Sequence, residues 1–174
     1  MENVILVDTQ DREVGVMEKM QAHQQAKLHR AFSVFLLNDK NEILLQQRAA
    51  NKYHCGGMWT NTCCSHPRVG ETLQIAVDRR LREEMGVVCE TNWIYSFIYK
   101  ADVGGGLVEH EFDHVFFGRF SGTPQPDESE VANWAYLGLN ELEEDVKNNP
   151  TKYTPWFKII LAEVVDKEIL NKVA

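Results

Sequence analysis

The chain has 174 residues, of which 44% are hydrophobic, and its formal net charge is -8. This length suits one domain, residues 1–174, with a core large enough to fold without disulfides. The acidic balance argues against a nucleic-acid partner, because phosphate backbones are bound by broad basic surfaces. A small anion is not excluded, since a few basic side chains can converge locally.

The sequence also bears on location and on the thiols. No apolar run is long enough to cross a bilayer, and the acidic N-terminus lacks the features of a signal peptide, so we expect a cytoplasmic protein with no membrane partner. The four cysteines include no CxxC pair, which favours free thiols over a structural zinc site. The oligomeric state stays open.

Short apolar segments separated by polar turns predict strands in the first third of the chain. The segments 4–7 and 14–17 flank a polar turn and predict a hairpin. A second hairpin is expected from 31–37 and 43–47, which flank the sequence NDKNE. Residues 48–58 follow as a loop, interrupted by a pair of glycines.

The pattern becomes helical from Thr72 to Met85, where apolar residues recur every four positions. Gly86 then stands where a C-terminal cap belongs. Strands are expected at 93–101, 107–120 and 131–137.

Two helices are predicted near the C-terminus. Asn140 and Glu143 resemble a capping pair that opens a short helix. Thr154 and Pro155 predict the start of a final helix, as N-cap and first helical residue, and its apolar residues recur at helical spacing. The whole pattern favours an α+β fold, a sandwich of mixed β-sheets flanked by helices.

The segment from Ser65 to Val87 carries the most informative motif. It resembles the Nudix box, G-x5-E-x7-R-E-U-x-E-E-x-G-U, where U is aliphatic. The matching residues are Glu71, Arg79, Leu81, Glu83, Glu84, Gly86 and Val87. Two positions depart from the pattern: Ser65 replaces the first glycine, and Arg80 replaces the glutamate after the arginine.

Carboxylates on one side of such a helix hold divalent cations, and those cations neutralise a diphosphate. Arg80 weakens the cluster that hydrolysis would use, but its guanidinium can bind a diphosphate directly. By spacing alone, this charged run is equally well a solvated, salt-bridged helix face.

A second group of residues suits a divalent metal. It consists of three histidines and two carboxylates: His23, His29, His66, Glu109 and Glu111. The two glutamates project together, because residues two apart on a strand share a face. By the same alternation, His110 and His114 should point away from them.

Several segments together resemble the type 1 isopentenyl-diphosphate delta-isomerases of the Nudix superfamily. They are LHRAFSVFL, WTNTCCSHP, RRLREEMGV, VEHE and TPW, and the resemblance extends from about Val4 to the final helix. The TNTCCSHP motif is highly specific. A degenerate Nudix box with a cysteine two residues before a metal-ligating histidine distinguishes this family from the Nudix hydrolases.

The resemblance implies two metal sites and an anion site. His23, His29, His66, Glu109 and Glu111 would bind Mg²⁺, Mn²⁺ or Zn²⁺. Glu84, with the Cys64 carbonyl, would hold a second Mg²⁺ that bridges to the diphosphate of a small-molecule substrate. The residues that would grip the diphosphate are Lys19, Arg48, Lys52 and Arg80.

The implied reaction is the 1,3-allylic rearrangement of isopentenyl diphosphate to dimethylallyl diphosphate through a tertiary carbocation. Cys64, Glu111 and Tyr99 would transfer protons, and Trp156 would lie beside the hydrocarbon tail. The sequence leaves open which residue gives the proton and which takes it. The competing hypotheses are a Nudix hydrolase that cleaves a diphosphate and a catalytically inactive binding domain.

Overall fold

A computed structural model describes residues 2–167 and residue 169, and strand β3 (His29–Leu37) lies at its centre. One edge of β3 pairs in parallel with β8 (Leu107–Arg119) over its whole length. The other edge pairs antiparallel with β1 (Asn3–Val7), then with β6 (Cys63–Ser65), and at its end with β4 (Ile43–Arg48).

Further strands extend this sheet in two directions. β7 (Thr91–Gly104) is antiparallel to β8, and β2 (Glu13–Glu18) is antiparallel to β1. On the other side, β4 turns away from β3 and pairs with both β9 (Val131–Leu137) and the short β5 (Trp59–Thr60).

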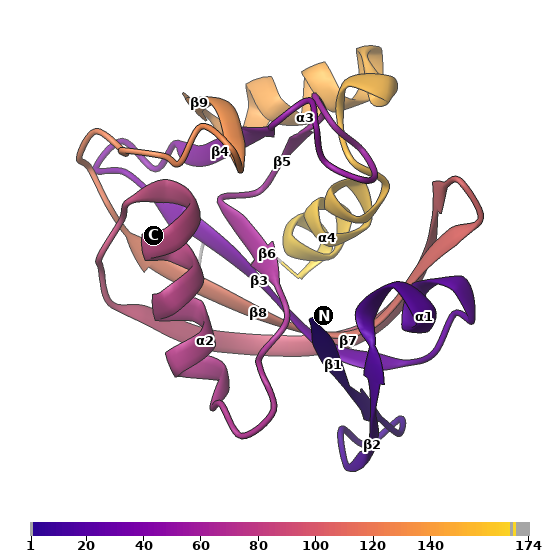
Figure 1. Cartoon of the computed structure of the whole chain (residues 1–174). Coiled ribbons are helices and arrows are strands. Elements are labelled where there is room, and N and C mark those ends of the chain that lie inside the picture. The colour runs from indigo at the N-terminus through magenta and orange to yellow at the C-terminus, as the bar shows by residue number, and fades with distance from the viewer. Residues whose placement is uncertain (1, 168, 170–174) are drawn as a thin grey trace.

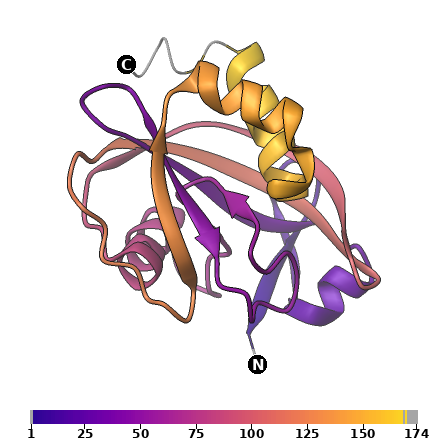
Figure 2. The ribbon, with the colours of Figure 1, turned by 90° about the horizontal axis from the view of Figure 1, so that it is seen from above.

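The two main helices cover opposite faces of the central strands (Figures 1 and 2). α2 (Leu73–Arg80) continues into a π-helical turn, η1 (Leu81–Met85), on one side. α4 (Pro155–Asp166) lies on the other, next to α3 (Leu139–Asn148). The short elements are α1 (Lys19–Gln24), which precedes β3, and the 3₁₀ turn η2 (Pro150–Lys152) before α4.

Alternation along β3 explains these layers. Phe32, Val34 and Leu36 belong to the core under α2, whereas Phe35 and Leu37 belong to the core under α4. All five are buried, which explains why this strand is a continuous apolar run rather than an alternating one.

The α+β prediction is confirmed, as are several local predictions. β1 and β2 form the first hairpin, with Ile5 opposite Val16. Thr154 caps α4, because its side chain accepts a hydrogen bond from the Phe157 amide. Gly86 ends the π turn in the left-handed region at φ 61°, and a Cβ there would collide with the Gln125 carbonyl oxygen.

Three features differ from the sequence-based expectation. The hairpin predicted from 31–37 and 43–47 is present but short: Leu37 pairs antiparallel with Ile43, the Asn38 amide bonds the Glu42 carbonyl at 3.0 Å, and beyond this point β4 pairs with β5 and β9 instead. The capping pair of Asn140 and Glu143 is wrong, because α3 starts at Leu139 behind the N-cap Gly138. The helix α1 was not predicted, since six residues are too few for a periodic signal. Among the described residues, no helix is long and apolar enough to span a membrane.

Candidate active site

Four side chains from four segments of the chain converge on one buried point. They offer atoms that all lie within 4.8 Å of one another: His23, His29, His66 and Glu109. His23 lies in the last turn of α1, His29 begins β3, His66 follows β6, and Glu109 lies on β8. The parallel register of β3 and β8 places His29 opposite Glu111, which brings both strands' ligands to one place.

Hydrogen bonds to the backbone orient two of these imidazoles. The Nδ1 atoms of His23 and His29 lie 2.5 Å and 2.8 Å from the carbonyl oxygens of Lys19 and Lys27. A ring that donates from Nδ1 leaves Nε2 as the metal-binding atom, a common arrangement around protein-bound metals. Consistent with this, Nε2 of His29 lies 3.1 Å from Nε2 of His66.

The buried atoms at this point contact one another without the geometry of ordinary hydrogen bonds. His23 Nε2 and Glu109 Oε2 form an ion pair at 2.8 Å, yet neither atom meets hydrogen-bond geometry with any described residue. Burial would raise the pKa of Glu109, but contacts with His23 and His54 hold it well below its ordinary value. A carboxylate facing several imidazole nitrogens is a donor set that fits a divalent metal.

Glu111 stands beside this cluster rather than within it. Its Oε1 lies 3.0 Å from His66 Nε2 and 3.7 Å from His29 Nε2. Its Oε2 accepts a hydrogen bond of 2.5 Å from the Tyr99 hydroxyl, which the β7–β8 register places directly opposite. Burial, followed by the charge of Glu111, raises the pKa of Tyr99 well above its ordinary value, so this hydroxyl stays a donor.

Cys64 and its neighbour Cys63 face opposite sides of β6, as strand alternation predicts. Cys63 is fully buried in the core under α2, whereas Cys64 lines the same pocket as Tyr99 and Glu111. Burial, with a smaller effect of the nearby Asp113, raises the pKa of Cys64 to about 12. The free protein therefore holds a neutral thiol.

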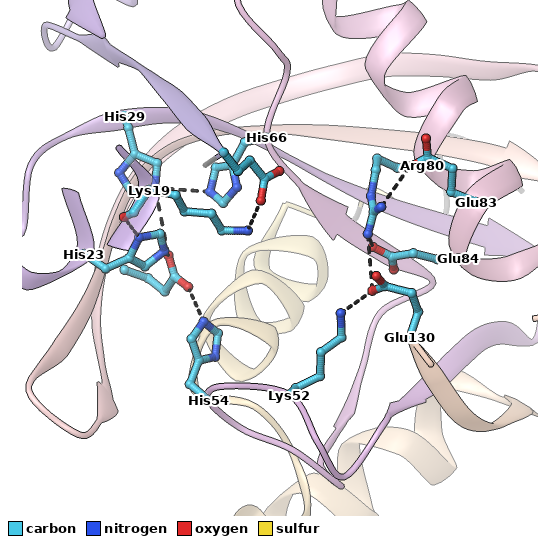
Figure 3. A network of polar contacts seen from close by, with 12 residues as sticks. Lys19, His23, His29, Lys52, His54, His66, Arg80, Glu83, Glu84 and Glu130 are labelled. Carbon is cyan, nitrogen blue, oxygen red and sulfur yellow. Dashed lines mark hydrogen bonds and ion pairs between the residues drawn. The ribbon is translucent and has the colours of Figure 1, made fainter. Parts of the chain in front are cut away.

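The four predicted diphosphate ligands line this pocket as well: Lys19, Arg48, Lys52 and Arg80. Figure 3 shows Lys19 beside the histidines, whereas Lys52 and Arg80 meet the carboxylates of Glu84 and Glu130. Glu84, which is only 6% exposed, also accepts a hydrogen bond of 2.9 Å from Gln46 Nε2. Positive charge thus gathers beside the carboxylate predicted to hold the second metal ion.

Trp156 in the first turn of α4 closes the apolar side of the pocket. It is 4% exposed, and its indole Nε1 donates a hydrogen bond of 3.1 Å to Thr60 Oγ1. The Arg48 guanidinium lies 5.2 Å from the ring centroid, within range of a cation–π contact. The sequence-predicted site residues are therefore brought together around one pocket.

Sequence reasoning missed three titratable residues here. His54 Nε2 lies 3.1 Å from Glu109 Oε1, and its ring meets Trp156 edge-on at 5.4 Å. Glu130 pairs with Lys52 and Arg80. Asp113 is fully buried, and burial with the charge of Glu111 raises the pKa of its carboxyl well above the ordinary value. Only Asp113 had a sequence signal, since it continues the alternation of Glu109 and Glu111.

The other two histidines point away, as predicted. Nδ1 of His110 lies 2.9 Å from the Ala26 carbonyl oxygen, and Nε2 of His114 lies 3.1 Å from an Asp11 carboxylate oxygen.

Known proteins resemble this chain in sequence and in fold. The NUDIX domain family matches residues 27–157. Isopentenyl-diphosphate delta-isomerase 2 of Aromatoleum aromaticum is 49% identical over 98% of this chain and 90% of its own. The isopentenyl-diphosphate delta-isomerase of Serratia proteamaculans is 45% identical over 97% of this chain and 94% of its own.

Solved structures agree on the fold. The DR0079 protein of Deinococcus radiodurans superposes with a TM-score of 0.78 at 18% identity, covering 93% of this chain and 98% of its own. A MutT NUDIX hydrolase from Burkholderia pseudomallei superposes with a TM-score of 0.61 at 21% identity, and the match covers 79% of this chain and 98% of the hydrolase. At such identities the likeness concerns the fold alone. The family match and the near-complete relatives, by contrast, show that the chain belongs to the NUDIX superfamily and, within it, to the isopentenyl-diphosphate delta-isomerase family.

Proposed function

We propose that this site converts isopentenyl diphosphate into dimethylallyl diphosphate. One observation carries the proposal: the half-buried thiol of Cys64 and a Tyr99–Glu111 pair line the same small pocket, next to a group of basic side chains. An allylic rearrangement needs one group that delivers a proton and another that removes one, and it needs an anchor for the diphosphate. We expect the substrate to be a free small molecule of the cytoplasm.

The basic side chains are assigned to the diphosphate. Lys19, Arg48, Lys52 and Arg80 provide charge-assisted hydrogen bonds, which are the strong ones for phosphate oxygens. Binding at this end, remote from the reacting carbons, supplies positioning energy for the hydrocarbon tail. Glu84 and the Cys64 carbonyl are assigned to a Mg²⁺ ion that accompanies the diphosphate.

The other divalent ion, Mg²⁺, Mn²⁺ or Zn²⁺, is assigned to the group of His23, His29, His66 and Glu109, with Glu111 beside it. A bound divalent ion supplies positive charge, which makes neighbouring carboxyl and hydroxyl groups stronger acids. The residues themselves fix the geometry: the Tyr99 hydroxyl holds one oxygen of Glu111, and His66 lies 3.0 Å from the other.

Glu111 with Tyr99 and the thiol of Cys64 are assigned to the two proton transfers. Protonation of an unactivated alkene produces a tertiary cation, and the π face of Trp156 stabilises positive charge near it. The buried walls of the pocket keep water from trapping this cation, since both Trp156 and Tyr99 are less than a tenth exposed.

The test is direct. The purified protein is incubated with Mg²⁺ and isopentenyl diphosphate, and the products are identified by NMR. We expect dimethylallyl diphosphate and no release of phosphate. Release of phosphate would identify a NUDIX hydrolase instead. No product of either kind would identify an inactive binding domain.

A further inference from the structure

A buried chain of hydrogen bonds joins Cys64 to Trp156. The Sγ of Cys64 donates to Asn61 Oδ1 at 2.8 Å, and the Thr60 hydroxyl donates to the same oxygen at 3.0 Å. The Thr60 oxygen in turn accepts from the Trp156 indole at 3.1 Å and from the Thr154 hydroxyl at 3.2 Å. Thr60, Asn61 and Thr154 are each at most 1% exposed.

Asn61 fixes the direction of the bonds that meet at its side-chain oxygen. Asn61 uses both amide hydrogens on backbone carbonyls, those of Val34 at 3.1 Å and Cys63 at 2.9 Å. Its oxygen must therefore face Cys64 and Thr60, where it can only accept. Thr60 has a single hydrogen, which is given to Asn61, so its oxygen is left to accept from the indole.

We propose that Thr60 and Asn61 are positioning residues that hold the Cys64 thiol and the Trp156 ring in one fixed arrangement around the substrate. The inference rests on the proposed isomerase function. Cys64 lies on β6 and Trp156 on α4, in elements that come from distant parts of the chain. The chain of hydrogen bonds sets their separation, and small misplacements of reacting groups are costly for catalysis.

The hydrogen bonds of Thr60 and Asn61 could also serve only to stabilise the fold, because buried polar groups need hydrogen-bond partners wherever they occur. Thr62 offers a matched comparison for that role. It lies two residues from Thr60, is fully buried, and its hydroxyl bridges the Leu44 carbonyl at 2.6 Å and the Leu36 amide at 3.0 Å. None of these contacts involves Cys64 or Trp156.

The experiment compares Thr60→Val, Thr60→Ser and Thr62→Val by steady-state kinetics with isopentenyl diphosphate, well below each melting temperature. Thr60→Val should lower kcat at least about tenfold with KM changed no more than about twofold, because chemistry rather than diphosphate binding is disturbed. Thr60→Ser keeps the hydroxyl and should retain kcat within about threefold. Thr62→Val should lose stability while keeping kcat within about twofold.

A measurement independent of turnover accompanies the kinetics. In ¹⁵N–¹H NMR spectra, the indole N–H of Trp156 is identified by its disappearance in Trp156→Phe. Its resonance should shift and exchange faster with solvent in Thr60→Val but not in Thr62→Val. An unaltered resonance in Thr60→Val, an unaltered kcat, or a Thr60→Ser variant as slow as Thr60→Val would each overturn the inference. Absence of turnover in the wild type would refute the proposed function, and the resonance would then decide whether the hydrogen-bond chain exists.

Discussion

Replacing Arg80 by methionine should weaken both the fold and substrate binding. The guanidinium of Arg80 meets three carboxylates: it pairs with Glu84, its Nη1 lies 2.8 Å from Glu83, and its Nη2 lies 3.4 Å from Glu130. Methionine keeps much of the apolar stem but leaves Glu84, whose side chain is 8% exposed, without its cation. A buried charge that loses its partner is strongly destabilising.

The expected loss of unfolding free energy follows from the burial of Glu84. Removing one partner of a fully buried pair costs about 3–5 kcal/mol, and the partial exposure of this group reduces the figure to about 2–3 kcal/mol. For a chain of this size each kcal/mol lowers Tm by about 2–4 °C, so we expect a loss of about 4–12 °C without metal. A lost charge-assisted hydrogen bond to phosphate, about 1.5–3 kcal/mol, should raise KM about 10- to 150-fold.

Thermal unfolding with and without Mg²⁺, together with steady-state kinetics, tests this prediction. Mg²⁺ should restore part of the lost Tm in Arg80→Met, because the ion neutralises Glu84 in place of the guanidinium. Arg82→Met is the matched control, since Arg82 is exposed and lies two residues further on, in the π-helical turn η1. If Arg80→Met matched Arg82→Met in both Tm and KM, the assigned role of Arg80 would be refuted.

The remaining predictions address the chemistry. Cys64→Ala should abolish isomerisation with the fold intact by circular dichroism, whereas Cys63→Ala, on the opposite face, should be much milder; equal residual turnover would contradict the assignment of the thiol. Chelation should stop turnover, and Mg²⁺ with Mn²⁺ or Zn²⁺ should restore it, so full activity in metal-stripped protein would disprove the metal assignment. Arg80→Glu restores the Nudix pattern but should not create an efficient phosphate-releasing enzyme, because it places a fourth carboxylate beside the diphosphate; efficient phosphate release would refute this. Trp156→Phe should keep much of the turnover and Trp156→Leu far less, at similar KM; equal turnover of the two variants would exclude cation stabilisation by the ring.

The sequence contained most of the fold and the residue types of the site. Periodicity located the helix that carries the Nudix box, and cap residues located the start of α4 at Thr154. Strand alternation correctly placed Glu109 and Glu111 on one face and Cys63 opposite Cys64. These features depend on contacts close in sequence, and such contacts are what local patterns encode.

Features that depend on contacts between residues far apart in the sequence could not be predicted from local patterns. His54 lies in a loop without a periodic pattern, and only the folded chain brings it to Glu109, which is 55 positions away. Glu130 likewise meets Lys52 and Arg80 only because β9 pairs with β4. The second hairpin is shorter than predicted for the same reason, since most of β4 pairs with the distant strands β9 and β5 rather than with β3.

The substitution in the Nudix box shows how one scaffold is adapted to different chemistry. A glutamate at position 80 would lie one helical turn from Glu83 and Glu84 and would extend a carboxylate cluster suited to several cations. Arginine at this position changes the local charge by two units and neutralises those same carboxylates, as its contacts with Glu83 and Glu84 show. Metal-binding capacity at this end of the pocket is thereby reduced, while the histidines and carboxylates around Glu109 form a separate cluster. Cys64 and Tyr99 line the same pocket as residues of both groups, so the fold is shared with hydrolases but the side chains that it brings together differ.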